Sequence, residues 1–449
     1  MNTKDSSLND FEIVVGLEIH VELTTKSKMF CQCQAEWFEM KPNSNVCPVC
    51  LGLPGALPVP NEKAIESCVK LALALGCDIN LNSKFDRKHY FYPDLPKGYQ
   101  ISQYDLPFGK NGNLEVVTDI SKNEKKSFGI TRVHMEEDTG KLNHFDNYSE
   151  VDFNRSGVPL VEIVTEPDFR SSSDVKLFLE ELRAIIVSLG ISGADMEKGS
   201  MRLEPNISVR RVGEKKLPGY KVEVKNINSF RYVKQAIDFE FARHMQLLLN
   251  GEVPAQETRG WNEKKNVTFS QRTKEGAADY RYFPEPDIPP IVISNVYIEK
   301  INASILALPM NKYENYLKEF KIKTTDAYIL SHDISLSDVF EKLVSHSSVI
   351  SPQAIANFLI NKKPDLNLGV ANLFDLIAKT NTIVSFDENE LIEIVNIVIS
   401  ENPGTVTTYR NGKESVIMYL VGLVMQSHKG KFPATKVKEE LERQLKNSA

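Results

Sequence analysis

The chain has no long hydrophobic run. Its longest apolar stretch near the end, residues 416–425, is about half the length that a membrane-spanning helix needs. The first ten residues contain neither an apolar core nor an arginine-rich amphipathic pattern, so we expect no secretory or transit signal. These absences predict a soluble, cytoplasmic protein without membrane contact, in which residues 416–425 form a buried core helix.

Several motifs that often reveal a function are also absent. No Gly-x-x-x-x-Gly-Lys-Ser/Thr loop occurs, so the sequence offers no P-loop for phosphate. Internal repeats and low-complexity tracts are missing, and no cysteine stands in a setting typical of a nucleophile. The formal net charge of −6 argues against a protein that coats nucleic acid along its whole surface.

The length of 449 residues is too great for one typical core and predicts two or three domains. Strand and turn patterns dominate up to a proline-rich segment, residues 284–290, although two helices are expected there, one after Asn61 with a glycine stop at Gly76 and one from Phe230 to Leu249 with a stop at Gly251. Beyond residue 290 the apolar spacing becomes helical, and one of the helices is expected over 326–343. We therefore predict an α+β protein. Its parts are a large mixed α/β cradle domain over 1–295, an all-α helical domain over 296–383, and a small helical tail domain over 384–449.

Positive charge is concentrated in the tail. Between residues 410 and 449 there are eight lysine and arginine residues against four acids. A basic tail on an acidic body is a candidate contact for a polyanion such as RNA. A solvated helix face explains such a run equally well.

The segment 11–23 alternates strictly, with every odd position apolar. Because successive side chains of a strand point to opposite sides, Glu18, His20 and Glu22 share one face. Two carboxylates around an imidazole suit a hard cation or a proton transfer. A half-solvated edge strand is the alternative interpretation.

Two later segments place carboxylates where a strand disfavours them. Residues 130–138 end in three consecutive acids, and residues 158–166 form an apolar strand with Glu162 inside it. Burial of a lone carboxylate costs several kcal/mol, so Glu162 must be protonated, paired or bound to metal. Arg132 or Arg155 could pair with it. The other interpretation is a Mg²⁺ site that gathers Glu18, His20, Glu136, Glu137 and Glu162.

Four of the six cysteines lie close together, in a Cys-x-Cys pair and a Cys-x-x-Cys pair. Two such pairs can complete a tetrahedron of thiolates, which predicts a structural zinc site in the loop 31–50. Free thiols are the alternative, and a disulfide is disfavoured in a chain without an export signal. The predicted zinc ligands are Cys31, Cys33, Cys47 and Cys50. The other two, Cys68 and Cys77, lie in or just after the helix expected to follow Asn61 and are predicted to be core residues.

Taken together, these segments resemble the GatB family, the B subunits of the amidotransferases that act on Glu-tRNA(Gln) and Asp-tRNA(Asn). One matching stretch is Val-Gly-Leu-Glu-Ile-His-Val-Glu-Leu at 15–23, and another is Ile-Thr-Arg-Val-His-Met-Glu-Glu-Asp at 130–138. The others lie at 84–88, 90–94, 162–168, 225–230 and 279–287.

The resemblance implies a ligase that forms C–N bonds with glutamine as the amide donor. Such proteins transfer the γ-phosphate of ATP to the side-chain carboxylate of the misacylated aminoacyl group, and ammonia then displaces the phosphate. ATP, Mg²⁺ and a structural Zn²⁺ are the implied substrate and metals. Since this chain has no serine-rich amidase signature, ammonia must come from the family's amidase partner, the A subunit, with a small C subunit completing a heterotrimer.

The resemblance also assigns residues. Glu18, His20, Glu137 and Glu162 match the magnesium-binding positions, with Glu136 adjacent to them. Lys88 matches a position near the mouth through which ammonia arrives, and the basic tail would contact tRNA(Gln) or tRNA(Asn). Two rival functions remain: a zinc-stapled RNA-binding protein without catalysis, and a metal-dependent hydrolase that acts on a small substrate.

Overall fold

The computed structural model describes residues 10–273, 280–346, 349–381, 388–427 and 432–447. Residue contacts divide the chain into two compact units. The first comprises residues 1–341 and 359–361, and the second comprises residues 342–358 and 362–449. The division predicted at residues 295 and 383 stays a prediction, and its second boundary lies outside the described residues.

The first unit is built on a mixed sheet of nine strands, with β1 (Phe11–Glu22) in the middle. Both neighbours of β1 run antiparallel to it, and β12 and β13 form a parallel pair. From edge to edge the order is β14 (Val267–Thr273), β13 (Glu257–Asn262), β12 (Val222–Lys225), β11 (Met201–Arg211), β1, β10 (Pro159–Thr165), β7 (Glu124–Glu137), β6 (Gly109–Asp119) and β2 (Asp78–Ile79).

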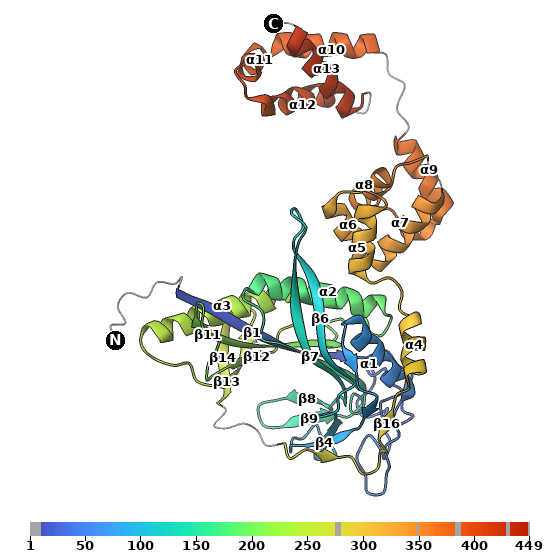
Figure 1. Ribbon diagram of the computed structural model, residues 1–449, viewed down its shortest axis with the longest axis vertical. Helices are drawn as coiled ribbons and strands as arrows, with labels where there is room; N and C mark the ends of the chain where they lie inside the picture. Colours follow the sequence, from blue (N-terminus) through green and yellow to red (C-terminus); the bar gives the residue numbers. More distant parts are fainter. Residues whose placement is uncertain (1–9, 274–279, 347–348, 382–387, 428–431, 448–449) are drawn as a thin grey trace. The chain divides into compact units, whose positions relative to one another are not determined.

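The alternation of β1 decides which face of the sheet is covered by helices. Its odd-numbered apolar side chains, from Ile13 to Val21, are buried in the main core. Figure 1 shows α2 (Ser172–Ser188) and α3 (Phe230–Leu249) along one face of the sheet, and α1 (Glu62–Ala74) completes this layer. Each fully buried Val, Leu or Ile stabilises the fold by about 1.5–3 kcal/mol, so this face is strongly specified.

The three helices begin at side-chain caps that the sequence supplies. Asn61, Ser171 and Ser229 each accept hydrogen bonds from backbone amides of the first turn. A glycine with positive φ follows α1 at Gly76 and α3 at Gly251. The predicted helices after Asn61 and from Phe230 to Leu249, each with its glycine stop, are confirmed.

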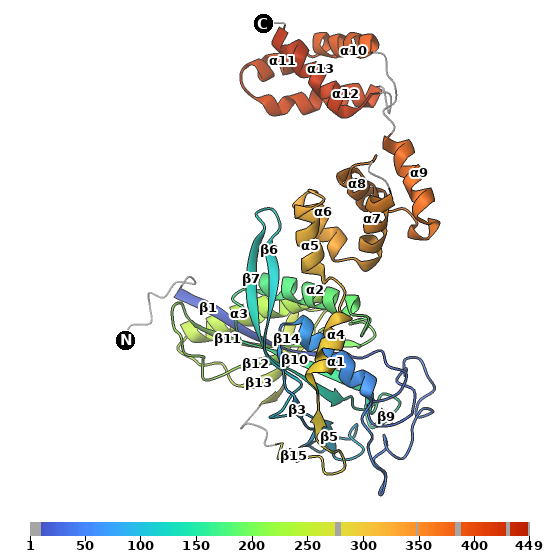
Figure 2. The same ribbon diagram turned by 45° about the vertical axis from the view of Figure 1, so that its right-hand side comes forward.

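Smaller elements lie on the opposite face of the sheet, as Figures 1 and 2 show from two directions. They form a three-stranded sheet and two short pairs. The three-stranded sheet is β15 (Phe283–Pro284), β4 (Asp86–His89) and β5 (Tyr99–Ser102), and the pairs are β16 (Ile291–Val292) with β3 (Asn82–Ser83) and β8 (Lys141–His144) with β9 (Ser149–Asp152).

Helices follow the sheet, namely α4 (Asn295–Ala303), α5 (Pro309–Lys318), α6 (Thr324–Ser331) and α7 (Ile334–His346), and the division between the units falls within α7. Lys125 of β7 binds Glu314 of α5 at 2.5 Å, which attaches α5 to the long hairpin of β6 and β7. A single helix was predicted over 326–343. The structure has two, because Asp333 accepts a hydrogen bond from the amide of Leu336 and caps a new helix.

The second unit is helical. Its elements are α8 (Pro352–Lys362), η2 (Leu366–Leu368), α9 (Val370–Asn381), α10 (Glu388–Glu401), α11 (Pro403–Arg410), η3 (Glu414–Val416), α12 (Ile417–Ser427) and α13 (Ala434–Asn447), although Leu359–Asn361 of α8 are grouped with the first unit. Leu391, Val395, Leu420, Val424 and Leu441 belong to one separate core that joins α10, α12 and α13. Residues 416–425, predicted as a buried helix, contribute to this core. The α+β class is confirmed.

Within the described ranges, none of the helices combines the length and apolar character that crossing a membrane requires.

Candidate functional site

The polar side chains of β1 face away from the helical layer. Strand register places His20 opposite Glu162 of β10, and Glu162 in turn opposite His134 of β7. Three adjacent strands therefore bring a histidine, a carboxylate and a second histidine into one row across the sheet. Cross-strand neighbours lie about 4.5–5.5 Å apart at Cβ, so their polar ends can share ligands.

Glu136 completes this group, which we call the carboxylate–histidine cluster: His20, His134, Glu136 and Glu162. Nε2 of His20 lies 3.4 Å from Glu162 and 4.0 Å from Glu136. Nε2 of His134 lies 3.3 Å from Glu162 and 3.4 Å from Glu136. One ligand atom from each of His20, Glu136 and Glu162 fits within 4.8 Å of the others, a spacing that suits a divalent cation.

The buried carboxylate of Glu162 is thus balanced by two histidines and not by Arg155, one of the two arginines that the sequence offered as the alternative to a metal site. Arg155 instead donates to the carbonyls of Thr139 and Gly140. Burial alone would raise the pKa of Glu162, but His134 and His20 hold that pKa well below its usual value. An ionised carboxylate inside the sheet is therefore compatible with the fold.

The histidine of β1 is charged in this setting. Burial would lower the pKa of His20, but the hydrogen bond and charge of Glu162, with the charges of Glu204 and Glu136, raise it to about 9. Burial likewise opposes the ionisation of Glu136, while Lys88 and His134 lower its pKa to about 2. In the ion-free protein the protonated His20 and Lys88 balance these two carboxylates, and a divalent cation bound here would displace the proton of His20.

The small sheet supplies further contacts to Glu136. The hydroxyl of Ser102 and the amide of Gln100, both on β5, donate to its carboxylate at 2.7 Å and 3.1 Å. Nζ of Lys88 on β4 lies 3.7 Å from Glu136 and faces the ring of Tyr280 at 5.2 Å. The structure thus brings the predicted residue Lys88 to the cluster.

Glu137 lies on the other side of β7 from Glu136, since neighbouring residues of a strand alternate. Its carboxylate accepts from the amide of Ile101 at 3.0 Å and pairs with Lys97 at 2.7 Å. It lines a cavity of about 240 Å³ beside Cys31 and Cys50. The structure does not bring Glu137 to His20 and Glu162.

Glu18 lies two residues before His20 on β1 and therefore on the same face of the strand. It borders a second cavity, of about 400 Å³. Its carboxylate accepts a hydrogen bond from Asn206 at 2.9 Å and lies 3.9 Å from Nζ of Lys221. Residues of β1, β10 and β11 form the floor of this cavity, and Tyr220 and Gln256 also line it. Glu18 is therefore beside the cluster but is not among its mutual contacts.

Sequence reasoning did not select His134, Gln100 or Ser102 as site residues. His134 stands two positions before Glu136, so alternation alone places both on one face of β7. That spacing was a usable signal for His134. Gln100 and Ser102 lie on a separate small sheet whose position no local pattern reveals.

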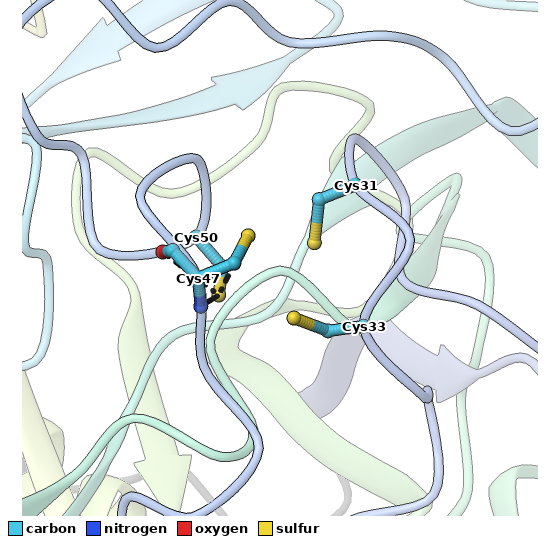
Figure 3. A group of neighbouring side chains, drawn as sticks. All are labelled: Cys31, Cys33, Cys47 and Cys50. Carbon is cyan, nitrogen blue, oxygen red and sulfur yellow. Dashed lines mark hydrogen bonds between the residues drawn. The ribbon is translucent and has the colours of Figure 1, made fainter.

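The four predicted zinc ligands lie together on two loops, as Figure 3 shows. Their sulfur atoms are all within 4.8 Å of one another, and those of Cys47 and Cys50 are 3.8 Å apart. Two thiolates on a tetrahedral Zn²⁺ at 2.3 Å would be about 3.8 Å apart. The donor set therefore fits zinc.

One thiol of this group is held as a thiolate. A hydrogen bond with Cys31, then the amide of Cys47 and the charge of Lys28, outweigh burial and lower the pKa of Cys50 to about 4. Cys68 and Cys77 lie in the hydrophobic core, as expected, and burial raises the pKa of Cys77 to about 12.

Comparison with known families decides what these features belong to. The family model described as "GatB/GatE catalytic domain" matches residues 13–299, and the model described as "GatB domain" matches residues 370–445. The chain belongs to the GatB family. The first match contains the carboxylate–histidine cluster, the four cysteines and both cavities.

Curated members of the GatB family cover nearly the whole chain. The chain is 43% identical to the B subunit of the aspartyl/glutamyl-tRNA(Asn/Gln) amidotransferase of Carboxydothermus hydrogenoformans, over 94% of this chain and 96% of that protein. It is 44% identical to the protein of the same name from Persephonella marina, over 97% and 100%. The predicted family, and the amidotransferase class that goes with it, are confirmed.

The sequence shows an excess of lysine and arginine in the tail of this GatB-family chain. In the structure, several of these cations form ion pairs within α13. On α13, Lys436 pairs with Glu439, Lys438 with Glu442, and Arg443 with Glu440. These cations are therefore partly neutralised within their own helix. Lys429 and Lys431, which belong to the predicted basic run, lie outside the described residues.

Proposed function

We propose that this chain activates the aminoacyl group in a tRNA-dependent amidotransferase. The observation that carries the proposal is the close approach of His20, Glu136 and Glu162 within the region matched by the GatB catalytic-domain model. The substrates would be Glu-tRNA(Gln), Asp-tRNA(Asn) or both, since the relatives' name includes both. The proposed setting is a cytoplasmic heterotrimer, in which the amidase is the A subunit and a small C subunit is the third component.

The proposed chemistry proceeds in two steps. A carboxylate oxygen of the glutamyl or aspartyl side chain takes the γ-phosphoryl group of ATP, which forms an acyl phosphate and ADP. Ammonia then attacks the carbonyl carbon, so that a C–N bond forms, the C–O bond to phosphate breaks, and a proton leaves the nitrogen. Phosphorylation is needed because carboxylate oxygen is a poor leaving group.

The carboxylate–histidine cluster is the proposed magnesium site. His20, Glu136 and Glu162 would hold the ion, and Glu18 flanks it on the side of the larger cavity. We assign Glu136 rather than Glu137 to this set because Glu137 points away from it and pairs with Lys97. Bound Mg²⁺ supplies neutralisation of the phosphate charge.

The larger cavity is the proposed place of the nucleotide. Its volume of about 400 Å³ lies within the range of small-ligand pockets. Lys221 at its wall provides a cation for phosphate, and the apolar side chains of Val14 and Leu17 provide contact area. Lys88, close to Glu136, would orient the negatively charged groups from the other side.

Amide formation by the reconstituted complex tests the proposal. Purified chain with its partner proteins, ATP, Mg²⁺ and misacylated Glu-tRNA(Gln) should yield Gln-tRNA(Gln), with either glutamine or concentrated ammonium as donor. Glu136→Gln should reduce product formation at least about 100-fold, the size expected when a metal site loses a ligand. Glu124→Gln is the matched control, because Glu124 lies on the same strand but is exposed.

The rival functions predict different results in the same assay. A zinc-stapled RNA-binding protein would bind tRNA regardless of the aminoacyl group and leave ATP intact. A small-molecule hydrolase would need neither tRNA nor partner proteins. Failure of the wild-type complex to form the amide with either donor would contradict the proposal.

A further inference from the structure

Lys28 is a lysine buried without a carboxylate. Its exposed fraction is 0%, and it lies in the loop between β1 and the first cysteine pair. No carboxylate oxygen of a described residue lies within ion-pair distance of its ammonium group. Its neighbours at hydrogen-bond distance are the carbonyls of Asn45 and Phe153, at 3.0 Å and 3.4 Å, and Sγ of Cys50 at 3.7 Å.

A buried ammonium group requires a counter-charge. Desolvation of an unpaired charge costs several kcal/mol, and two neutral carbonyls do not compensate for it. The only anionic group in contact with Lys28, among the residues that the structure describes, is the sulfur of Cys50. Four thiolates around Zn²⁺ carry a net negative charge, and this charge would make the site the missing partner.

We propose that Lys28 is the built-in counter-cation of a thiolate-bound metal at Cys31, Cys33, Cys47 and Cys50. The hydrogen bond from Nζ to Cys50 reduces the negative charge that this sulfur places on the metal. The inference rests on metal binding by the cysteines, and it is independent of the proposed amide transfer.

The position of Lys28 also links the cysteine-bearing loop 31–50 to the segment 153–158, which leads into β10. Nζ donates to Phe153, and the hydroxyl of Ser156 donates to the carbonyl of Cys50. Residues 153–158 precede the strand that carries Glu162. Loss of the metal would leave the ammonium with Cys50 as its single anionic contact among the described residues, so this segment should loosen together with the cysteine loops.

Lys28→Met tests the role, since methionine keeps most of the side-chain length and removes the charge. In the zinc-loaded full-length chain the variant should bind zinc about 10–100-fold more weakly, as is usual for groups that contact metal ligands. Its melting temperature should fall with zinc bound. After treatment with a chelator the difference from the wild type should shrink, because the ammonium then faces the single thiolate of Cys50 and no longer four metal-bound thiolates.

Asn154→Ala is the matched control. Asn154 is fully buried and fastens the same loop, accepting from the amide of Asn45 and donating to the carbonyl of Lys41, and none of its hydrogen bonds with described residues goes to a sulfur atom. This variant should lower the melting temperature with and without zinc. In cobalt-loaded protein the sulfur-to-metal charge-transfer band should move to longer wavelength only in Lys28→Met, because hydrogen bonds to a thiolate weaken its electron donation.

If Lys28→Met does not fold, Lys28→Arg and Lys28→Gln give the same comparison, with zinc affinity retained by arginine and lost by glutamine. The inference is overturned if loss of the charge lowers both melting temperatures equally and leaves zinc affinity and the cobalt band unchanged. A wild-type chain that binds no zinc would also overturn it. Neither outcome would bear on the formation of Gln-tRNA.

Discussion

Glu162 and His134 face each other on neighbouring strands, with Oε2 of the carboxylate 3.3 Å from Nε2 of the ring. His134 is almost fully buried, so its main role in the free protein is to hold this carboxylate in place. The pair therefore connects the stability of the sheet with the geometry of the proposed magnesium site.

Removal of His134 should destabilise the protein. His134→Leu leaves Glu162 with His20 as its remaining partner, and breaking a buried charge pair costs about 3–5 kcal/mol. Urea unfolding should show a loss of at least about 2 kcal/mol, reduced from that range because His20 remains. His144→Leu, at an exposed histidine, is the control, and an equal effect of both changes would refute the role of His134.

Glu22 should make stability depend on pH. Burial, together with the charge of Asp138, raises the pKa of Glu22 from 4.5 to about 8, despite Arg202 and the indole of Trp37. The folded protein therefore keeps a proton that the unfolded chain releases between about pH 4.5 and 8. The free energy of unfolding should fall across this window, by on the order of 2 kcal/mol.

Glu22→Gln tests this prediction, since the amide can still accept from Trp37 but cannot ionise. The variant should be more stable than the wild type at pH 8 and should lose this part of the pH dependence. Thermal or urea unfolding at several pH values measures it. A wild-type protein that gains stability between pH 5 and 8 through Glu22 would contradict the assignment.

The cysteine site should stabilise the first unit through its metal. Cys47→Ser should release zinc and lower the melting temperature. Zinc that binds the folded chain and not the unfolded chain stabilises the fold, and the stabilisation grows with the affinity of the site. A chelator should lower the melting temperature of the wild type and leave that of Cys47→Ser unchanged. Metal analysis of both proteins completes the comparison, and equal zinc content would show that the site is elsewhere.

In the tail, an unpaired lysine should matter more for tRNA binding than a paired one. Lys413 is exposed and has no ion pair with a described residue, whereas Lys438 pairs with Glu442. Lys413→Ala should weaken binding at low salt and reduce the salt slope by about one, and Lys438→Ala should do less. Titrations of tRNA binding at several salt concentrations would compare the two variants. A larger loss of affinity for Lys438→Ala than for Lys413→Ala would contradict the prediction.

The cap of α3 offers a local test of the fold. The hydroxyl of Ser229 accepts from the amide of Tyr232 at 3.2 Å. Ser229→Ala should cost about 0.5–2 kcal/mol in urea unfolding. Ser229→Asp should restore most of the loss, since aspartate is an equally good cap.

Local patterns in the sequence were enough to predict β1, α1, α3, the interior strand around Glu162 and the four-cysteine group. Alternation and capping involve residues only a few positions apart, so the chain determines these elements by itself. The break between α6 and α7 was missed because Asp333 competes locally with a continuous apolar pattern.

The composition of the cluster was decided by tertiary structure. Sequence favoured Glu137, yet the pairing of β7 with β10 turns Glu136 and His134 toward Glu162. Likewise, the burial of Lys28 depends on the segment at Phe153, more than a hundred residues away. Local side-chain periodicity thus determined which residues share a face, while long-range strand pairing and loop packing decided which of those faces meet.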